Sequence, residues 1–287
     1  MNYGIPYQGS KSGIAEWVVS WLPPSHTLVD LFAGGCAVTH AALLSGKFGR
    51  VIANDLGDGP QVFRDAANGE FEGYATVPTR GEFHARKDDD AALALLYSFG
   101  SDGDSYLWNT KIEDVKLHAS RMLSAPSVHE RRMEYRAFCR SLARWLSETG
   151  DVGKLGKGNG IGELEGLERL ERLETPKLDY RDVGIPDGAT VYADPPYRRT
   201  LHDSRQYGGG FDYGNFEGWL ASVAFPVIVS EYDRPAGCVE IASGEKNVTM
   251  NDKTTTKATE RLFVQERFLG EYERRMSEVG LFAGGES

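Results

Sequence analysis

The chain has 287 residues, of which 40% are hydrophobic and 26% are charged, so it can bury one large core or one core plus an inserted region. The formal net charge of -10 argues against a protein that coats nucleic acid through bulk positive charge. Residues 111–144 nevertheless carry eight basic side chains against four acidic ones, which indicates either a local basic surface or an ordinary solvated helix face.

Cysteine and histidine usage points away from disulfides and metals. The three cysteines and six histidines lie far apart, without the spacing of a disulfide framework or a metal site. No apolar run approaches the ~20 residues of a membrane-spanning helix, and the first residues lack the pattern of a secretory signal. We therefore expect a cytoplasmic location, with neither a membrane nor a metal partner.

The start of the chain alternates helices and strands. The expected elements are a helix over residues 14–21, a strand over 27–32, a helix over 37–44 and a strand over 49–53. A glycine turn precedes the second helix, and Asn54-Asp55 follow the second strand. This order predicts a βαβ unit, which is typical of the nucleotide-binding half of a doubly wound sheet.

The alternation is lost between residues 58 and 177. Helical spacing is confined to residues 91–99 and 128–146, and seven glycines in residues 150–166 are typical of a loop or linker. A leucine at about every third position of residues 164–173 favours a short helix or an extended ladder. We interpret this region as a mainly helical insertion in an α/β sheet.

The α/β pattern then resumes to the end of the chain. The expected elements are a strand and turn over residues 177–183, a strand over 189–193, a helix over 215–223, a strand over 225–229, and a closing hairpin of residues 239–242 and 260–264. The fold class predicted for the whole chain is therefore α/β with an open, mostly parallel sheet.

Asp194-Pro195-Pro196-Tyr197 directly follows one of these buried strands. Ligands of an open parallel sheet lie beyond the carboxyl ends of its strands, so Asp194 would project into a crevice. A carboxylate, a stiff turn and an aromatic face can together hold an exocyclic amine. The alternative is an ordinary Asp-Pro turn on the surface.

A second candidate site lies at the amino-terminal βαβ unit. Residues 30–36 read Asp-Leu-Phe-Ala-Gly-Gly-Cys, where an acid ends the strand and small residues let a ligand approach the backbone. Both the Gly-x-Gly-x-x-Gly fingerprint and the P-loop are absent, so phosphate binding is not favoured. Asp55 is placed to accept hydrogen bonds from a ribose diol, unless both acids serve only as turn residues.

The order of these motifs resembles the Dam-type (D12 class) DNA adenine-N6 methyltransferases, including phage-encoded members. The resemblance is carried by residues 6–11 (Pro-Tyr-Gln-Gly-Ser-Lys), 30–35, 54–55, 179–180 and 194–197. It implies a Rossmann-like S-adenosylmethionine-dependent methyltransferase sheet built from residues 1–57 and 176–287, with residues 58–175 as the inserted target-recognition region. It also implies double-stranded DNA as partner, in a bacterial or phage-infected host cell.

The resemblance implies roles for particular residues. Tyr7, Gly9 and Lys11 would lie near the methionine part of the cofactor, and Asp55 at its ribose. Asp30, Leu31, Phe32, Ala33, Gly34, Gly35 and Cys36 would surround its amino acid moiety. Asp179 and Tyr180 would meet its adenine, and Asp194 would lie beside it. Cys36 stands where the commonest form of the family has a further glycine.

The predicted chemistry addresses the weak nucleophilicity of adenine N6. Asp194 and the Pro195 carbonyl would accept the two N6 hydrogens and return electron density to nitrogen, while the Pro195-Pro196 turn keeps that carbonyl in place. Tyr197 would stack on a flipped base. Predicted DNA contacts are Arg131, Arg132 and Arg136 on a helix and Tyr207 and Phe211 in a loop that either closes over the base or is an ordinary surface loop. Residues 230–232 are a further candidate for lining the crevice.

We therefore predict a site-specific DNA adenine-N6 methyltransferase of the kind found in restriction-modification; whether a restriction endonuclease is its partner stays open. An amino-methyltransferase acting on RNA adenine, cytosine N4 or a protein amide is one alternative. A non-catalytic DNA-binding module on the same fold is another, which Asp194 and Tyr197 disfavour because a pure binder has no use for an amine-accepting turn. The recognised sequence and the oligomeric state stay open.

Overall fold

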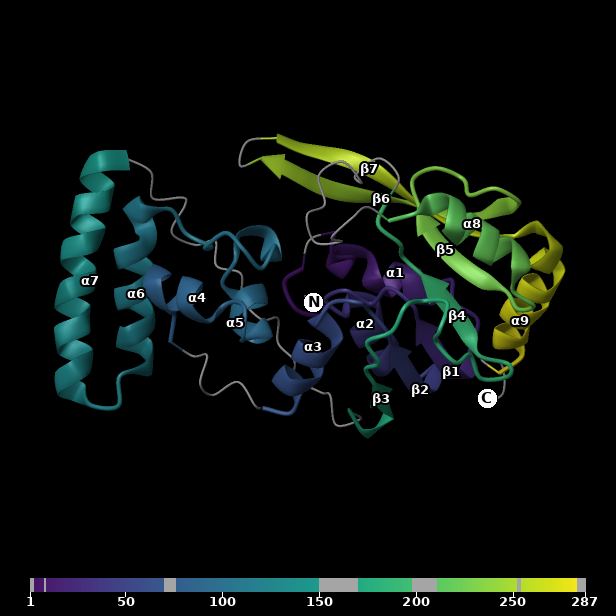
Figure 1. Cartoon of the computed structure of the whole chain (residues 1–287), viewed down its shortest axis with the longest axis horizontal. Helices are drawn as coiled ribbons and strands as arrows, with labels where there is room; N and C mark the ends of the chain where they lie inside the picture. Colours follow the sequence, from purple (N-terminus) through teal and green to yellow (C-terminus); the bar gives the residue numbers. More distant parts are fainter. Residues whose placement is uncertain are drawn as a thin grey trace. The chain divides into compact units, whose positions relative to one another are not determined.

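The computed structural model describes residues 3–7, 9–69, 76–149, 170–197, 211–251 and 254–282. The chain divides into two compact units (Figure 1). The sheet unit comprises Met1–Ile5, Gly9–Arg64 and Gly162–Ser287, and the helical unit comprises Pro6–Gln8 and Asp65–Ile161. The assignment of target recognition to residues 58–175 stays a prediction.

Seven strands form one sheet in the order β3-β2-β1-β4-β5-β7-β6. They are β1 (Ser25–Asp30), β2 (Phe48–Ala53), β3 (Leu173–Glu174), β4 (Thr190–Ala193), β5 (Val227–Glu231), β6 (Cys238–Asn251) and β7 (Thr254–Gln265). The pairs from β3 to β5 are parallel, and β7 is antiparallel to both β5 and β6. This arrangement confirms the predicted α/β class with a Rossmann-like, mostly parallel sheet.

Of the strand and turn predicted over residues 177–183, the turn is confirmed and the strand is wrong. The sheet instead takes the two-residue edge strand β3, and residues 179–183 form turns. Two local features stop a strand here: Pro176 precedes the segment, and the Asp179 side chain accepts a hydrogen bond from the Arg181 backbone N–H at 3.0 Å, which closes an Asx turn.

The sheet register brings the carboxyl ends of three parallel strands to one edge. The Leu31 N–H donates to the Tyr192 carbonyl at 2.9 Å, and the Asn54 N–H donates to the Asp30 carbonyl at 2.8 Å. Asp30 ends β1, Asp55 follows β2 and Asp194 follows β4. The strand order reverses between β1 and β4, so this edge is the topological switch point where such folds bind ligands.

Helices of the sheet unit pack apolar side chains against the strands. They are α1 (Ala15–Ser20), α2 (Ala37–Ser45), α3 (Gly59–Ala67), α8 (Tyr213–Ser222) and α9 (Leu269–Phe282). The division between the units falls within α3. α8 buries Phe216 and Leu220 in a core cluster with strand residues that include Val191 and Val229. This packing fixes the strands whose ends carry the site.

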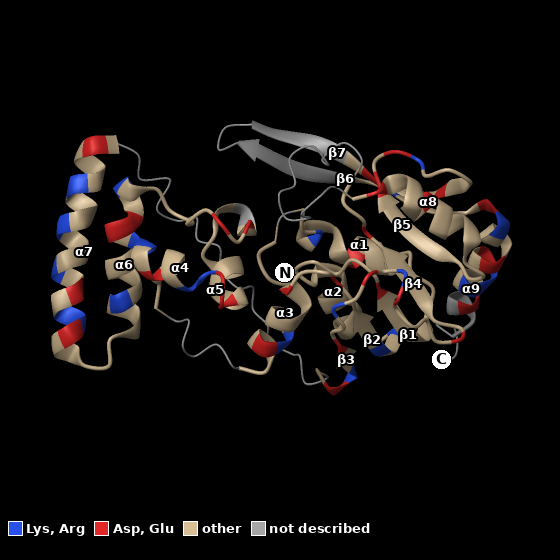
Figure 2. Cartoon of the chain, viewed as in Figure 1, with Lys and Arg blue, Asp and Glu red and all other residues tan. Residues whose placement is uncertain are grey.

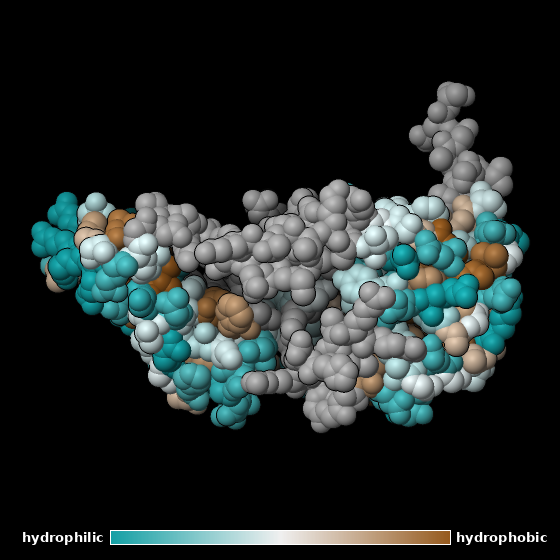
Figure 3. Space-filling model, turned by 90° about the horizontal axis from the view of Figure 1, so that it is seen from above, coloured by the Kyte–Doolittle hydropathy of each residue, from teal (hydrophilic) through white to brown (hydrophobic). Residues whose placement is uncertain are grey.

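The helical unit contains α4 (Arg80–Arg86), α5 (Ala91–Leu96), α6 (Thr110–Ser124) and α7 (Val128–Thr149). α6 and α7 lie side by side and share a small core of Ile112, Val115 and Trp145 (Figure 1). The face of this unit that Figure 3 shows is mainly hydrophilic, with separate apolar patches. Exposed apolar side chains of these two helices include Leu123, Val128, Met133 and Tyr135. The predicted mainly helical character of this region agrees with these elements.

Candidate active site

Asp30 is a buried carboxylate at the end of β1. Its side chain is 1% exposed, and the Thr39 hydroxyl donates to Oδ2 at 2.8 Å. Oδ1 accepts no hydrogen bond from any residue that the structure describes. Burial raises the pKa of Asp30 to about 7; the Thr39 hydrogen bond opposes this rise and the nearby Asp194 charge adds to it. Asp30 therefore changes protonation near neutral pH and offers one buried oxygen to a cationic ligand.

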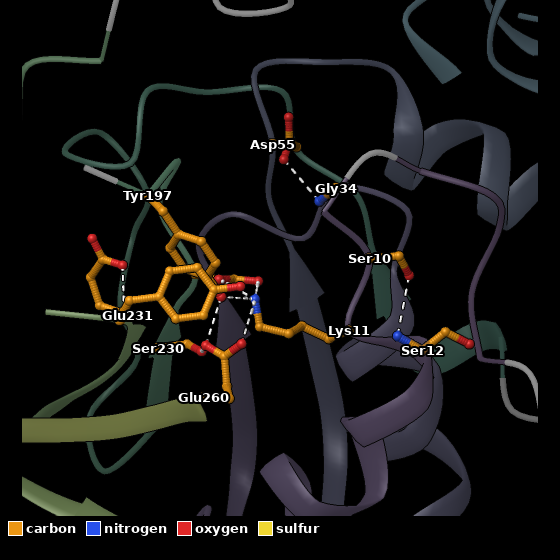
Figure 4. Close-up of polar contacts among 11 residues, drawn as sticks. Ser10, Lys11, Ser12, Gly34, Asp55, Tyr197, Ser230, Glu231 and Glu260 are labelled. Atoms are coloured by element: carbon orange, nitrogen blue, oxygen red, sulfur yellow. Dashed lines mark hydrogen bonds and ion pairs between the residues drawn. The ribbon is translucent and has the colours of Figure 1, made fainter. Parts of the chain in front are cut away.

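Asp55 holds the glycine turn that follows β1. Its Oδ2 accepts the Gly34 N–H and its Oδ1 accepts the Gly57 N–H, both at 2.8 Å (Figure 4). The side chain is 4% exposed, and this burial raises its pKa. Each carboxylate oxygen keeps a second lone pair, so the predicted ribose contact stays compatible with this bonding.

The turn after β1 is closed from the other side by the amino-terminal residues. Gly4 has a φ of +71°, and a Cβ there would lie 2.2 Å from the Gly35 carbonyl oxygen, so only glycine fits. The Ile5 N–H donates to that same oxygen at 2.8 Å. Cys36 follows with a φ of 61°, a left-handed conformation that glycine adopts without a steric penalty.

At position 36 we expect glycine to give a more stable protein than alanine, which is the reverse of their usual order of stability. Both Cys36→Gly and Cys36→Ala remove the buried thiol, but only glycine relieves the left-handed backbone. We expect the glycine variant to be more stable than the alanine variant by about 1 kcal/mol in denaturant unfolding. An alanine variant as stable as the glycine variant would show that the backbone at Cys36 carries no strain.

The Lys11 ammonium group binds the Asp194 carboxylate of the predicted catalytic motif. Its Nζ donates to Oδ1 and Oδ2 of Asp194, each at 2.7 Å, and contacts the Tyr197 hydroxyl (Figure 4). The Lys11 side chain is 3% exposed and that of Asp194 is 17% exposed. The resemblance assigned Lys11 to the methionine part of the cofactor, and the structure adds this direct contact with Asp194. Both oxygens of Asp194 are thus already holding a nitrogen.

Glu260 on β7 is a second buried carboxylate in this cluster, and sequence analysis missed it. Its side chain is 0% exposed, and Oε1 accepts hydrogen bonds from Tyr197 and Ser230, both at 2.7 Å. Oε2 lies 3.9 Å from the Lys11 Nζ. The available signal was period-two alternation, because Glu260 stands on the same buried strand face as Leu262 and Val264.

Tyr197 is packed into the cluster rather than projecting from it. Its side chain is 9% exposed, and its ring lies 4.4 Å from the Tyr232 ring and 4.5 Å from the Lys11 Nζ. Burial, followed by the charges of Asp194 and Glu260, raises the pKa of Tyr197 well above 10.0, so the hydroxyl stays protonated. Stacking of Tyr197 on a target base stays a prediction.

Asn54 positions the segment predicted to meet the cofactor's adenine. Its side-chain N–H donates to the Leu178 carbonyl and its Oδ1 accepts the Leu178 N–H, both at 3.0 Å. The Tyr180 ring then lies 5.3 Å from Phe32 and 5.1 Å from Trp219. The Asn54 side chain thus pairs with the backbone N–H and carbonyl of Leu178, as the backbone of a neighbouring strand would. Sequence analysis noted Asn54 only as a motif position.

The comparison with known families agrees with this geometry. Residues 7–63 match the model of the D12 class N6 adenine-specific DNA methyltransferases. Over these residues the chain is similar to that family. The match includes Lys11, Asp30 and Asp55 and ends before Asp194. No curated protein matches the chain.

The matched family methylates adenine N6 in DNA, and this similarity implies S-adenosylmethionine as methyl donor. Among the residues described, no group of three or more His, Cys, Asp or Glu could hold a metal ion. In the same part of the chain, no helix combines the length and the apolar surface needed to cross a membrane.

The three arginines predicted to contact DNA are exposed on α7, a helix that carries several basic residues (Figure 2). Arg132 and Arg136 form a row with Arg140 at a spacing of four residues, which places them on one helix face. Arg131 lies beside this row, and its guanidinium donates to the Ala125 carbonyl at 3.5 Å. Arg140 belongs to the basic cluster of residues 111–144 but was not among the predicted DNA contacts, although its spacing was a usable signal.

Three further predicted residues are only partly accounted for. Tyr7 belongs to the helical unit, so its approach to the cofactor stays a prediction. Phe211 packs 5.7 Å from Phe32 and 6.1 Å from Tyr180, and its DNA contact also stays a prediction. Tyr207 lies outside the described residues, as does most of the leucine repeat of residues 164–173.

Proposed function

We propose that this enzyme transfers a methyl group from S-adenosylmethionine to N6 of an adenine flipped out of double-stranded DNA at a specific site. The observation that carries the proposal is the contact of Lys11 with Asp194, because both carboxylate oxygens hold one nitrogen at 2.7 Å. An adenine amine presents the same kind of hydrogen-bond donor to that carboxylate. With DNA as substrate, the expected location is the cytoplasm.

The residues beyond β1 and β2 suit the proposed cofactor. Asp30 Oδ1 is buried and accepts no hydrogen bond from the described residues, so it fits the cationic amino group of a methionine. Asp55 fits the ribose diol, and the rings of Phe32 and Tyr180 fit an adenine. When bound, S-adenosylmethionine supplies a methyl group on a positively charged sulfur.

The chain's own groups act on the target amine. Asp194 accepts one N6 hydrogen and the Pro195 carbonyl accepts the other, which directs the nitrogen lone pair towards the methyl carbon. Holding both partners in line supplies most of the rate gain, an effect worth up to ~7 to 11 kcal/mol. Once N6 carries the methyl group, Asp194 is the nearest base for its surplus proton. Tyr197 stacks on the base during these steps.

Labelled methyl transfer to unmethylated DNA tests the proposed function. We expect label from S-adenosylmethionine in N6-methyldeoxyadenosine after nucleoside digestion. Label in N4-methyldeoxycytidine, or transfer to RNA but not to DNA, would instead support the alternative of an amino-methyltransferase on another substrate.

The row of arginines on α7 is proposed to contact DNA phosphates. Arg136→Glu should weaken binding to duplex DNA of any sequence at least about tenfold at low salt and make binding less salt-dependent. Arg274→Glu is the matched control, because Arg274 is also an exposed helical arginine, 64% exposed on α9 and paired with Glu278. Fluorescence anisotropy titration measures the affinity for DNA. If both variants lose the same affinity, α7 is an ordinary solvated helix that does not contact DNA.

A further inference from the structure

The contact between Lys11 and Asp194 raises a problem of charge for the proposed reaction. The target amine needs the Asp194 oxygens that Lys11 occupies at 2.7 Å. Lys11 is only 3% exposed, so its ammonium cannot simply turn into water when the amine arrives. A buried ammonium without a carboxylate is strongly unfavourable. Lys11 therefore needs a second acceptor close by.

Glu260 offers that second acceptor. Tyr197 and Ser230 both donate to its Oε1, which fixes the carboxylate (Figure 4). Its Oε2 accepts no hydrogen bond from the described residues and lies 3.9 Å from the Lys11 Nζ. An ordinary charge-assisted hydrogen bond spans ~2.8 Å, so the ammonium needs to move by only about 1 Å.

We propose that Glu260 is a positioning residue that takes over the Lys11 ammonium when the target amine binds Asp194. This role rests on the proposed adenine methylation at Asp194. Lys11 stays paired throughout, with Asp194 before the base arrives and with Glu260 afterwards. No proton changes place in this exchange. The Asp194 carboxylate then accepts the N6 hydrogen where it accepted the Lys11 ammonium before.

Two substitutions separate the charge of Glu260 from its shape. Glu260→Gln keeps the length and the Oε1 acceptor but removes the charge, whereas Glu260→Asp keeps the charge and shortens the side chain. A role in receiving the ammonium predicts that the aspartate variant is the more active of the two. A role limited to packing and hydrogen bonding with Tyr197 and Ser230 predicts the reverse order.

The measurement is the kcat of labelled methyl transfer to unmethylated DNA, together with the Kd of S-adenosylmethionine. We expect Glu260→Gln to lower kcat at least about tenfold, and Glu260→Asp to retain at least about threefold more activity than the glutamine variant. The cofactor Kd should change less than about twofold in either. Glu240→Gln, at a half-exposed carboxylate of the neighbouring strand β6, is the control and should keep wild-type kcat.

A glutamine variant as active as the aspartate variant, or more active, overturns the role of Glu260. Failure of the glutamine variant to fold also overturns this role. In that variant Lys11 and Asp194 still form a neutral ion pair, so we expect the protein to remain folded. The proposed function fails separately, if the wild-type enzyme transfers no label to DNA. Label transfer by the wild type with the wrong order of variants removes only the Glu260 inference.

Discussion

Asp194→Asn should lower the kcat of adenine methylation at least about a hundredfold. The amide has no negative charge, and its NH2 group meets the donors of Lys11 and of the target amine where Asp194 offers two acceptors. The amine then keeps its lone pair in the adenine ring. The KM for DNA should stay within about threefold, since the contacts proposed on α7 are unchanged. Labelled methyl transfer under saturating cofactor measures both quantities.

Asp187→Asn is the matched control for this substitution. Asp187 is an exposed carboxylate in the turn before β4, so the same chemical change falls at the opposite end of the strand that Asp194 follows. Its kcat should equal that of the wild type. An Asp194→Asn enzyme that keeps more than about a tenth of the wild-type rate would remove Asp194 from the amine-accepting role.

Cofactor binding should weaken steeply below neutral pH because of Asp30. Its pKa is about 7, and the cationic amino group of S-adenosylmethionine prefers the ionised carboxylate. Binding at lower pH must first expel a proton, so the Kd should rise roughly twentyfold between pH 7.5 and pH 5.5. Isothermal titration calorimetry at the two pH values measures this change and the accompanying proton release.

The Asp30→Asn variant provides the control for this pH dependence. It should bind the cofactor weakly at both pH values and lose the slope, although Asp55, Asp194 and Lys11 remain around the site. The same pKa shift acts on the free protein. Burial raises the pKa of folded Asp30 from its ordinary value of 3.8 to about 7. The protonated Asp30 therefore stabilises the folded protein at low pH, and this stabilisation is lost as the pH rises to about 7. A cofactor Kd that is equal at pH 5.5 and 7.5 in the wild type would contradict the Asp30 assignment.

Local patterns were enough for most elements of the sheet unit. The helices predicted over residues 14–21 and 37–44 match α1 and α2, and the predicted closing hairpin matches β6 and β7. These segments carry their own periodicity and end signals, which neighbouring residues determine. The strand expected within residues 177–183 is absent because Pro176 and the Asp179 turn end extended pairing there, and the Leu178 backbone binds the Asn54 side chain, a contact that local sequence does not encode.

The sequence alone determined which carboxylates end the strands, namely Asp30, Asp55 and Asp194, because a strand and its boundary are local features. Only the tertiary structure decided that Lys11 binds Asp194 and that Glu260 lies beside them. Lys11 and Glu260 are 249 residues apart in the sequence. Asp194 follows β4, the antiparallel β7 beside β5 returns Glu260 to the same edge, and Lys11 reaches both from the segment before α1. Pairing of buried charges depends on that return, and no local pattern encodes it.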